Sequence, residues 1–408
     1  MLVRRCLGAL AALGLGLAAA IATAFGASLA EPAALVTSHE SALSPQAQLG
    51  RQIFFDAALS VSGKLSCASC HDPASAYAAP KTSGVVMTGG ASMDRPGLRA
   101  VPSLRYLSDT PRFARHSYID VGRDREDVGP AGGLMLDGRA DNLREQMLLP
   151  LLDPAEMGNA NVQEVTARLA RAPYAGELRE IASAAAPGAP PLVAAAGAAL
   201  ERFELEDPSF HPYTSRFDNY LRGTGTLSPD ELEGLRLFVD PAKGNCAACH
   251  SATTGPGGSP PTFTDHSYHA LGVPRNPAIP ANTEPRFFDL GMCGPRRADL
   301  RAETQYCGYF KTPTLRNVTR RHFFFHNGRF TALQDVMRFY VERDTRPESW
   351  YPTIAGRLRK FDDMPARYRE NVNTSDAPLN RGPGDSPALD HVEIEKIIAF
   401  LGTLSDVD

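Results

Sequence analysis

The chain has 408 residues, which is long enough for two domains, because a single apolar core rarely grows beyond about 250–300 residues. Hydrophobic residues make up 43% of the chain, charged residues make up 22%, and the formal net charge is −4. This balance excludes a disordered polyelectrolyte and differs from the strongly basic balance of nucleic-acid-binding proteins. The 35 glycines and 33 prolines indicate long loops, and Trp350 is the single tryptophan.

The N-terminus has the pattern of a secretory signal peptide. Arg4 and Arg5 form a basic start, Leu7–Phe25 is an apolar run, and small residues offer cleavage sites after Ala27 or Ala30. An uncleaved membrane anchor is the alternative, because nineteen residues approach the length that spans a bilayer. Most of the run is alanine and glycine, so its hydrophobicity is low and cleavage is favoured. We therefore expect export to the periplasm.

Capping residues and apolar periodicity predict six helices along the chain. They are the segment opened by Ser44-Pro45, the segment after Asn161, the alanine-rich residues 192–205, the segment opened by the Ser228–Glu231 capping box, Thr331–Arg343 with a Thr331/Gln334 box, and a final helix capped by Asp390 and Glu393. No run of strict alternation predicts a sheet, and the proline- and glycine-rich residues 251–311 are expected to be ordered loop. The predicted fold class is mainly α with long ordered loops.

Two C-x-x-C-H motifs indicate covalently attached haem. They are Cys67-Ala-Ser-Cys70-His71 and Cys246-Ala-Ala-Cys249-His250. In this signature the two thiols add to the haem vinyl groups, and the adjoining histidine becomes an axial ligand of the iron. A redox-active C-x-x-C or a zinc site is the alternative, but neither explains why a histidine adjoins both pairs. We therefore predict two covalently bound haem c groups.

The remaining cysteines and the spacing of the motifs bear on domain organisation. Cys293 and Cys307 are expected to form a disulfide, because an oxidising compartment favours disulfides over free thiols. The two haem motifs lie 179 residues apart, one in each half of the chain. We predict a signal peptide at 1–30 and two cytochrome-c-like haem domains at 31–206 and 207–408.

With both haem motifs placed, the chain resembles the bacterial di-haem cytochrome c peroxidases, a family that includes the MauG-type enzymes. The resemblance covers nearly the whole mature chain, in order, and its motifs are Leu49-Gly50-Arg51, Phe54-Phe55-Asp56, Asp137-Gly138-Arg139-Ala140, Gln146, Asp153–Met157, Thr312–Asn317, His326-Asn327-Gly328 and Ile398–Leu401. It implies that the N-terminal haem reacts with hydrogen peroxide and that the C-terminal haem transfers electrons.

The resemblance also implies catalytic residues over the N-terminal haem. Gln146 and Glu156 match the two polar distal residues of the family. A carboxylate there can take the proton from one peroxide oxygen and return it to the leaving oxygen. The alternative for Glu156 is a surface position in a cap or an ion pair, which is the usual place of a lone glutamate.

The sixth ligand of the N-terminal haem differs from that of the typical peroxidases in the family. Those enzymes carry a distal histidine at the position that Met87 takes here, and the next histidine along the chain is His116. Met87 is a candidate thioether ligand, although a methionine in an apolar stretch more often packs. We favour an iron with an open site, as in the MauG-type enzymes.

The resemblance places the sixth ligand of the C-terminal haem fourteen residues after His326, at Tyr340. Typical peroxidases have a methionine there and MauG-type enzymes a tyrosine. Met337 is the competing ligand, because it lies one helical turn away on the same face. A thioether raises the haem potential, whereas an anionic phenolate favours oxidised iron. We favour Tyr340.

Two departures limit the analogy. The family's tryptophan between the haems corresponds to Leu136, so a relay aromatic is missing or comes from elsewhere. The expected calcium segment reads Arg99-Ala100-Val101-Pro102 and lacks the asparagine ligand, although carbonyl ligands at Arg321 and Phe323 would survive. Because calcium takes six to eight oxygen ligands, we expect this site to be weak at best.

Residues 295–329 carry eight lysines or arginines against two acids. Pairing with acids and haem propionates is the simpler interpretation, and a docking patch for an acidic electron donor is the alternative.

Three functions follow from these residues. The first is a periplasmic peroxidase that receives electrons from a small cytochrome c or cupredoxin. The second is a MauG-type oxidase of a partner protein, which Tyr340 favours. The third is a plain electron carrier, which would not need Gln146 and Glu156. We expect the first, with no nucleic-acid partner and with a homodimer left open.

Overall fold

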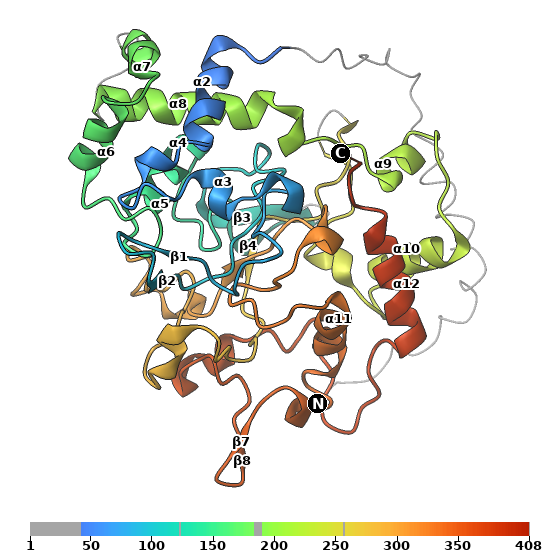
Figure 1. Ribbon diagram of the computed structural model, residues 1–408. Helices are drawn as coiled ribbons and strands as arrows, with labels where there is room; N and C mark the ends of the chain where they lie inside the picture. The colour runs from blue at the N-terminus through green and yellow to red at the C-terminus, as the bar shows by residue number, and fades with distance from the viewer. Residues whose placement is uncertain (1–41, 122–123, 183–189, 256–257, 408) are drawn as a thin grey trace. The chain divides into compact units, whose positions relative to one another are not determined.

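The computed structural model describes residues 42–407 apart from 122–123, 183–189 and 256–257 (Figure 1). The predicted signal peptide lies outside these residues. The α-helices are α2 (Pro45–Phe54), α3 (Cys67–Cys70), α4 (Leu143–Gln146), α5 (Leu148–Leu152), α6 (Val162–Leu169), α7 (Ala175–Ala182), α8 (Pro191–Glu206), α9 (Arg216–Leu221), α10 (Pro229–Val239), α11 (Leu333–Glu342) and α12 (His391–Gly402). Within the described part, no helix is long and apolar enough to cross a membrane.

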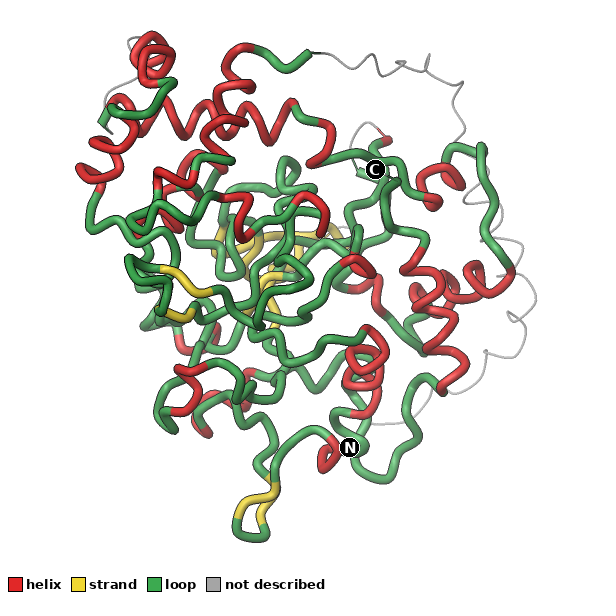
Figure 2. The backbone as a smooth tube through the Cα atoms, viewed as in Figure 1, coloured by secondary structure: helices red, strands yellow, loops and turns green. Residues whose placement is uncertain are grey.

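Strands are short and paired two by two. They are β1 (Thr88–Gly89), β2 (Arg95–Pro96), β3 (Ala114–Val121), β4 (Asp124–Ala131), β5 (Tyr268–His269), β6 (Phe310–Lys311), β7 (Thr353–Ile354) and β8 (Arg357–Leu358). Consecutive strands pair antiparallel, β1 with β2 and so on to β7 with β8. Helix and loop therefore make up most of the described chain, as Figure 2 shows, and the prediction of a mainly α fold is confirmed.

Capping side chains begin the helices where the sequence predicts them. Ser44 caps α2 and Asn161 caps α6, each accepting a hydrogen bond from a backbone N–H of the first turn. Reciprocal capping boxes open α10 at Ser228 and α12 at Asp390. The alanine-rich helix α8 also forms as predicted.

Each half of the chain has its own apolar cluster, built around one pair of helices. In the first cluster, formed within residues 49–210, α2 packs on α8. In the second, formed within residues 217–404, α10 packs on α12. A glycine makes each contact close: a Cβ on Gly50 would overlap the Ala199 carbonyl, and a Cβ on Gly234 would overlap the Lys396 carbonyl.

Two expectations about local structure were wrong. The β3–β4 hairpin was not foreseen, because most of the described residues of β3 are exposed on both faces, so the sequence carries no alternating apolar pattern. Helix α11 begins at Leu333 with Ala332 as its N-cap, and no side chain caps it. The predicted Thr331/Gln334 box therefore does not form, because Gln334 is the second helical residue and not the third.

The region 251–311 is mostly ordered loop, as expected, and it ties the two halves of the chain together. Ser267 forms an isolated antiparallel bridge with Ala131, and the Lys311 N–H donates to the Leu136 carbonyl at 2.9 Å. A disulfide joins Cys293 to Cys307 within this region. The first two of these links hold the backbone of Ala131 and Leu136 against Ser267 and Lys311 in the second half of the chain.

Candidate active site

The histidines of both haem motifs are held in the same way. His71, at the end of α3, and His250, after the short 3-10 helix η4 (Cys246–Ala248), each place Nδ1 3.1 Å from a carbonyl, of Tyr77 and Phe263 respectively. A carbonyl can only accept a hydrogen bond, so Nδ1 carries the proton and Nε2 keeps its lone pair. This orientation is the one that a metal-ligating histidine needs.

Burial keeps both imidazoles neutral. It lowers the pKa of His71 to about 4 and also lowers the pKa of His250. A neutral ring is the form that binds a metal ion. Together with two cysteines in each motif that form no disulfide, these histidines fit two covalently attached haem groups.

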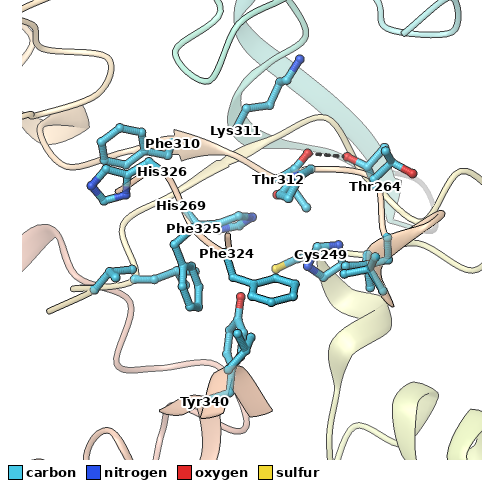
Figure 3. Close-up of a pocket in the computed structure, with 18 of the residues that line it drawn as sticks. Cys249, Thr264, His269, Phe310, Lys311, Thr312, Phe324, Phe325, His326 and Tyr340 are labelled. Atoms are coloured by element: carbon cyan, nitrogen blue, oxygen red, sulfur yellow. Dashed lines mark hydrogen bonds between the residues drawn. The ribbon is translucent and has the colours of Figure 1, made fainter. Parts of the chain in front are cut away.

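One cavity receives side chains from both halves of the chain (Figure 3). Its lining includes Cys246, Cys249, His250, Met337 and Tyr340 from the second half and Leu136 and Gln146 from the first half. Its walls also contain Arg321, whose buried Nε has no hydrogen-bond partner among the described residues. Burial lowers the pKa of Arg321 to about 10. The Nη2 of Arg321 donates to the Arg316 carbonyl at 2.9 Å, so the guanidinium keeps one buried donor, Nε, for a group with carboxylates such as the propionates of haem.

Tyr340 points its hydroxyl from α11 into this cavity (Figure 3). Burial, and to a lesser degree the nearby sulfurs of Cys249 and Cys246, raises the pKa of Tyr340 well above its usual value. The phenol is therefore neutral unless a cation lies beside it, and a bound metal ion can remove the proton of a coordinating group. Met337, the competing residue, lines the same cavity from the same helix.

Gln146 ends helix α4 and lines the cavity from the first half of the chain. Its Oε1 is buried and has no hydrogen-bond partner in the described part of the chain. A buried unsatisfied carboxamide oxygen costs stability unless it has a binding role.

Glu156 lies beside the first haem motif. Burial, and to a lesser degree the charge of Glu156, raises the pKa of the Cys70 thiol to about 12. Burial raises the pKa of Glu156 itself, and the guanidinium groups of Arg139 and Arg99 partly offset that rise. Glu156 is partly buried.

A network of buried charges surrounds Glu156 and crosses between the halves of the chain. Arg99 pairs with Asp137 at 2.7 Å and with Asp289 at 2.6 Å, and Arg139 pairs with Asp137 at 2.8 Å. Asp137 is fully buried. Burial alone would raise its pKa, but the two guanidinium groups outweigh burial and hold the pKa below its usual value. The sequence carried no signal for these partners, because Asp289 lies 190 residues from Arg99.

The remaining candidates lie elsewhere. Met87 is partly exposed and is not among the residues that line the cavity. His116 is exposed on β3, where its Nδ1 lies 2.6 Å from Asp127. Of the basic stretch 295–329, Arg297 and Arg316 are buried and paired with carboxylates, which agrees with the interpretation of paired charges.

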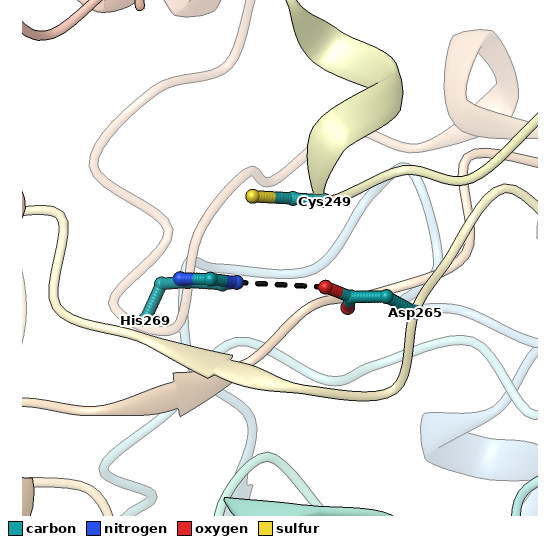
Figure 4. Close-up of side chains that lie close together, drawn as sticks. All are labelled: Cys249, Asp265 and His269. Atoms are coloured by element: carbon teal, nitrogen blue, oxygen red, sulfur yellow. Dashed lines mark ion pairs between the residues drawn. The ribbon is translucent and has the colours of Figure 1, made fainter. Parts of the chain in front are cut away.

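Sequence reasoning missed a histidine–aspartate pair next to Cys249 (Figure 4). His269 Nε2 lies 3.6 Å from Asp265 Oδ2 and 2.8 Å from the Ser267 hydroxyl. Burial opposes a charge on His269, but the Asp265 carboxylate and the Cys249 sulfur outweigh it and raise the pKa to about 10. The three groups could hold a metal ion, but Cys249 belongs to the haem motif. We therefore interpret His269 and Asp265 as an ion pair beside the haem pocket.

Comparison with known proteins agrees with this geometry. A family model described as di-haem cytochrome c peroxidase matches residues 44–226. The methylamine utilization protein MauG of Paracoccus denitrificans is 32% identical over 367 residues, covering 88% of each protein. Cytochrome c551 peroxidase of Nitrosomonas europaea is 27% identical over 302 residues, covering 71% of each. The solved diheme peroxidase BthA of Burkholderia thailandensis is 40% identical, with a TM-score of 0.78, over 89% of this chain and 87% of that one.

Proposed function

Because this chain belongs to the family of di-haem cytochrome c peroxidases and MauG proteins, we propose that it reduces hydrogen peroxide beside its first haem motif, with electrons from a small redox protein that enter through the second. The family is one of oxidoreductases acting on peroxide, and it implies two haem c groups. The proposal is carried by the partly buried Glu156, whose charge acts on Cys70 of the first haem motif and whose own pKa is raised by burial.

The haem groups, attached through the four motif cysteines with His71 and His250 as axial ligands, would supply iron that binds peroxide and exchanges electrons. Glu156 takes the proton from one peroxide oxygen and returns it to the oxygen that leaves as water. Its raised pKa makes the carboxylate a stronger base for the first step, and a pKa nearer to neutral keeps both the ionised and the protonated form accessible for the two steps. The family resemblance implies that Gln146 hydrogen-bonds the peroxide; in the structure its buried Oε1, which has no hydrogen-bond partner among the described residues, lines the cavity that also contains the second haem motif.

We further propose that the Tyr340 phenolate is the second axial ligand of the C-terminal haem. Its hydroxyl faces the cavity that Cys249 and His250 line, and burial prevents ionisation without a neighbouring cation. An anionic oxygen ligand stabilises ferric iron and gives a low potential. Met337 is the rival ligand.

Oxidation of a partner protein is the second candidate function. It is favoured by Tyr340, because a haem with an oxygen ligand is a poor acceptor for high-potential electron donors. Steady-state turnover with a reduced electron donor distinguishes the two candidate functions. A peroxidase turns over continuously with a reduced cytochrome or cupredoxin, whereas an oxidase of proteins does not.

We also propose a periplasmic location, supported by the signal-like N-terminus and the c-type haem motifs. We do not propose a calcium ion at the segment Arg99–Pro102, because Arg99 itself pairs with the carboxylates of Asp137 and Asp289.

The test of the function is Glu156→Gln. The amide cannot accept the proton, so we expect the second-order rate constant for the reaction with hydrogen peroxide to fall at least about tenfold, within the range that general acid–base catalysis contributes. Stopped-flow absorbance measures this rate, and a pyridine haemochrome assay should find the haem content unchanged. Glu164→Gln, in the first turn of α6, is the matched control and should react at the wild-type rate. Equal rates in the Glu156 variant and wild type would make Glu156 structural.

A further inference from the structure

We propose that Trp350 is the outer end of an aromatic path that carries single electrons between the protein surface and the cavity holding Tyr340. Through it, the enzyme would oxidise one-electron donors too large to enter that cavity, such as a reduced redox protein. The inference rests on the proposed peroxide-reducing function and names the place where the donor's electron enters.

The path consists of ring contacts that leave the cavity in two branches. One branch runs from Tyr340 to Phe339, with ring centroids 6.3 Å apart, and from Phe339 to Trp350, at 5.6 Å. The other runs from Tyr340 through Phe325 and Phe330 to Trp350, with steps of 5.8, 5.5 and 5.7 Å. The ring centroids of Tyr340 and Trp350 are therefore no farther apart than the sum of the two steps through Phe339.

The two ends of the path differ from its middle. Tyr340 and Phe325 line the cavity, whereas Phe330 and Phe339 are buried in the apolar cluster of the second half. Trp350 is partly exposed. Phenylalanine is very hard to oxidise, so the two buried rings act as a bridge that electrons cross. Of the rings between the cavity and the surface, the indole is the most easily oxidised, and it stands at the end that reaches solvent.

Packing alone does not explain an indole at this position. Buried tryptophan N–H groups usually find a hydrogen-bond acceptor, but Trp350 Nε1 is buried and has none among the described residues. A phenylalanine would fill much of the same space without leaving this donor unsatisfied. The same feature suits electron transfer, because an oxidised indole with no acceptor keeps its proton. One electron then returns it to its starting state.

The charges around the ring allow its oxidation. Arg338 lies over Trp350, with its guanidinium carbon 5.5 Å from the ring centroid, and alone it would oppose a positive charge there. Its own charge is offset, because Arg338 pairs with Glu342 at 3.0 Å and with Asp335 at 3.9 Å. All three residues lie on α11, the helix that carries Tyr340.

The electron balance is that of peroxide reduction. One hydrogen peroxide takes two electrons and two protons and leaves as two waters. Each electron passes inward from Trp350, which becomes an indole radical cation, and a donor molecule at the surface then reduces that radical and is itself oxidised by one electron. Two donor molecules are oxidised for each peroxide, and the two protons come from solvent.

The test uses the haem-loaded full chain treated with one equivalent of hydrogen peroxide and frozen within milliseconds. We expect an electron paramagnetic resonance signal whose hyperfine pattern narrows when the protein is grown with indole-deuterated tryptophan. The assignment is unambiguous, because Trp350 is the only tryptophan in the chain. The signal should be absent in Trp350→Phe and should last longer in Arg338→Gln, where the opposing charge is gone.

Donor size supplies the second readout. With reduced azurin, a cupredoxin too large for the cavity, Trp350→Phe should lower the oxidation rate at least tenfold, and Trp350→Tyr should restore part of it. With hydroquinone, which is small, the rate should change less than twofold. Tyr351→Phe is the matched control, because its ring contacts Phe361, off the path, and both donors should be oxidised at wild-type rates.

The outcomes separate this inference from the proposed function. If wild type reacts with peroxide, but deuteration leaves every radical signal unchanged and Trp350→Phe oxidises azurin as fast as wild type, the path is overturned and Trp350 only packs. If wild type does not react with peroxide at all, the proposed function fails and this inference fails with it.

Discussion

At the scale of single residues, the site depends on polar groups that the fold buries without a full set of partners. His71 and His250 each use one nitrogen to reach a carbonyl and keep the other available. Gln146 Oε1 has no hydrogen-bond partner within the described part of the chain, and Tyr340 holds a neutral hydroxyl in the cavity. Each arrangement costs folding free energy in the absence of a ligand, so each indicates a group that is bound in the active protein.

Tyr340→Met tests the axial ligand of the second haem. Exchanging a phenolate for a thioether should raise the reduction potential of that haem by on the order of a hundred millivolts, because axial ligands tune haem potentials over roughly 0.8 V. A spectroelectrochemical titration measures the shift. Tyr220→Phe, at a tyrosine packed against the same apolar cluster, should leave the potential unchanged. A near-infrared histidine–methionine charge-transfer band in wild type that disappears in Met337→Leu would identify Met337 as the ligand instead.

Glu156 should also govern the pH dependence of the peroxide reaction. Its carboxylate must be ionised to take the first proton, and burial raises its pKa above the ordinary glutamate value. The rate constant should therefore fall as the pH decreases through that raised pKa, and Glu156→Gln should lose this acid limb. Stopped-flow measurements between pH 4 and 8 test this, and an identical acid limb in the variant would assign the titration to another group.

At the scale of secondary-structure elements, the two halves of the chain build their cores in the same way. Each builds its core on a pair of helices, α2 with α8 and α10 with α12, and each pair approaches closely at a glycine. Glycine in a helix interior costs about 0.5–1 kcal/mol relative to alanine, so its presence at Gly50 and Gly234 is explained by the close contact. The haem motifs that follow α2 and α10 pack, through Cys67 and Cys246, against the apolar clusters that these helix pairs form.

Gly234→Ala should destabilise the protein. The new Cβ would overlap the Lys396 carbonyl, so α10 and α12 must separate, at a cost of about 1–3 kcal/mol. Denaturant unfolding monitored by circular dichroism measures the change. The control is Gly176→Ala in α7, where a Cβ meets no atom within 4 Å, and it should be neutral or slightly stabilising. Equal stability of the two variants would show that the helices tolerate the separation.

At the scale of the whole molecule, buried ion pairs join the halves of the chain around the proposed peroxide site. Arg99 reaches both Asp137 in the first half and Asp289 in the second. The Arg297 guanidinium also donates to the Asp137 carbonyl at 2.7 Å. The Arg99 guanidinium also partly offsets the increase that burial causes in the pKa of Glu156. The contact between the halves and the reactivity of Glu156 are therefore coupled.

Asp137→Asn should be strongly destabilising, because Arg99 and Arg139 would remain buried beside a neutral group. Breaking a buried pair in this way costs about 3–5 kcal/mol. The carboxylate has a lowered pKa in the folded state, so it contributes stability above its usual pKa and loses it as the pH falls through the lowered value. Urea unfolding from pH 3 to 7 should therefore show a shallower acid dependence in the variant. Glu284→Gln, which removes the charge of an exposed pair with the exposed Arg286, is the control and should cost less than about 1 kcal/mol.

Two haem groups per chain is the prediction that belongs to the whole protein. A pyridine haemochrome assay on the purified protein should give two covalent haems for each polypeptide. Cys249→Ser with Cys246→Ser should leave one. A single haem in the wild type would contradict the assignment of one of the motifs.

The sequence by itself determined the features that depend on a few neighbouring residues. The haem motifs span five residues each, and the helix caps at Ser44, Asn161, Ser228 and Asp390 act within one turn. Haem attachment and first-turn hydrogen bonds depend on residues within a few positions of one another, so most of them can be predicted without the tertiary structure; the Thr331/Gln334 box is the exception, because α11 begins one residue later than that box requires. The family resemblance, carried by short motifs in order, is likewise a property of the sequence.

Only the tertiary structure decided which distant groups meet. The pairing of Arg99 with Asp289, the ion pair of His269 beside Cys249 and the contact of Trp350 with Phe330 and Phe339 depend on how loops fold back. Such contacts leave no periodic pattern in the sequence, because the residues around a charge or a ring in a loop are the same whether or not a distant partner lies nearby in the fold. The β3–β4 hairpin stayed hidden for a related reason: most of the described side chains of β3 are exposed, so no buried face imposes alternation on that part of its sequence.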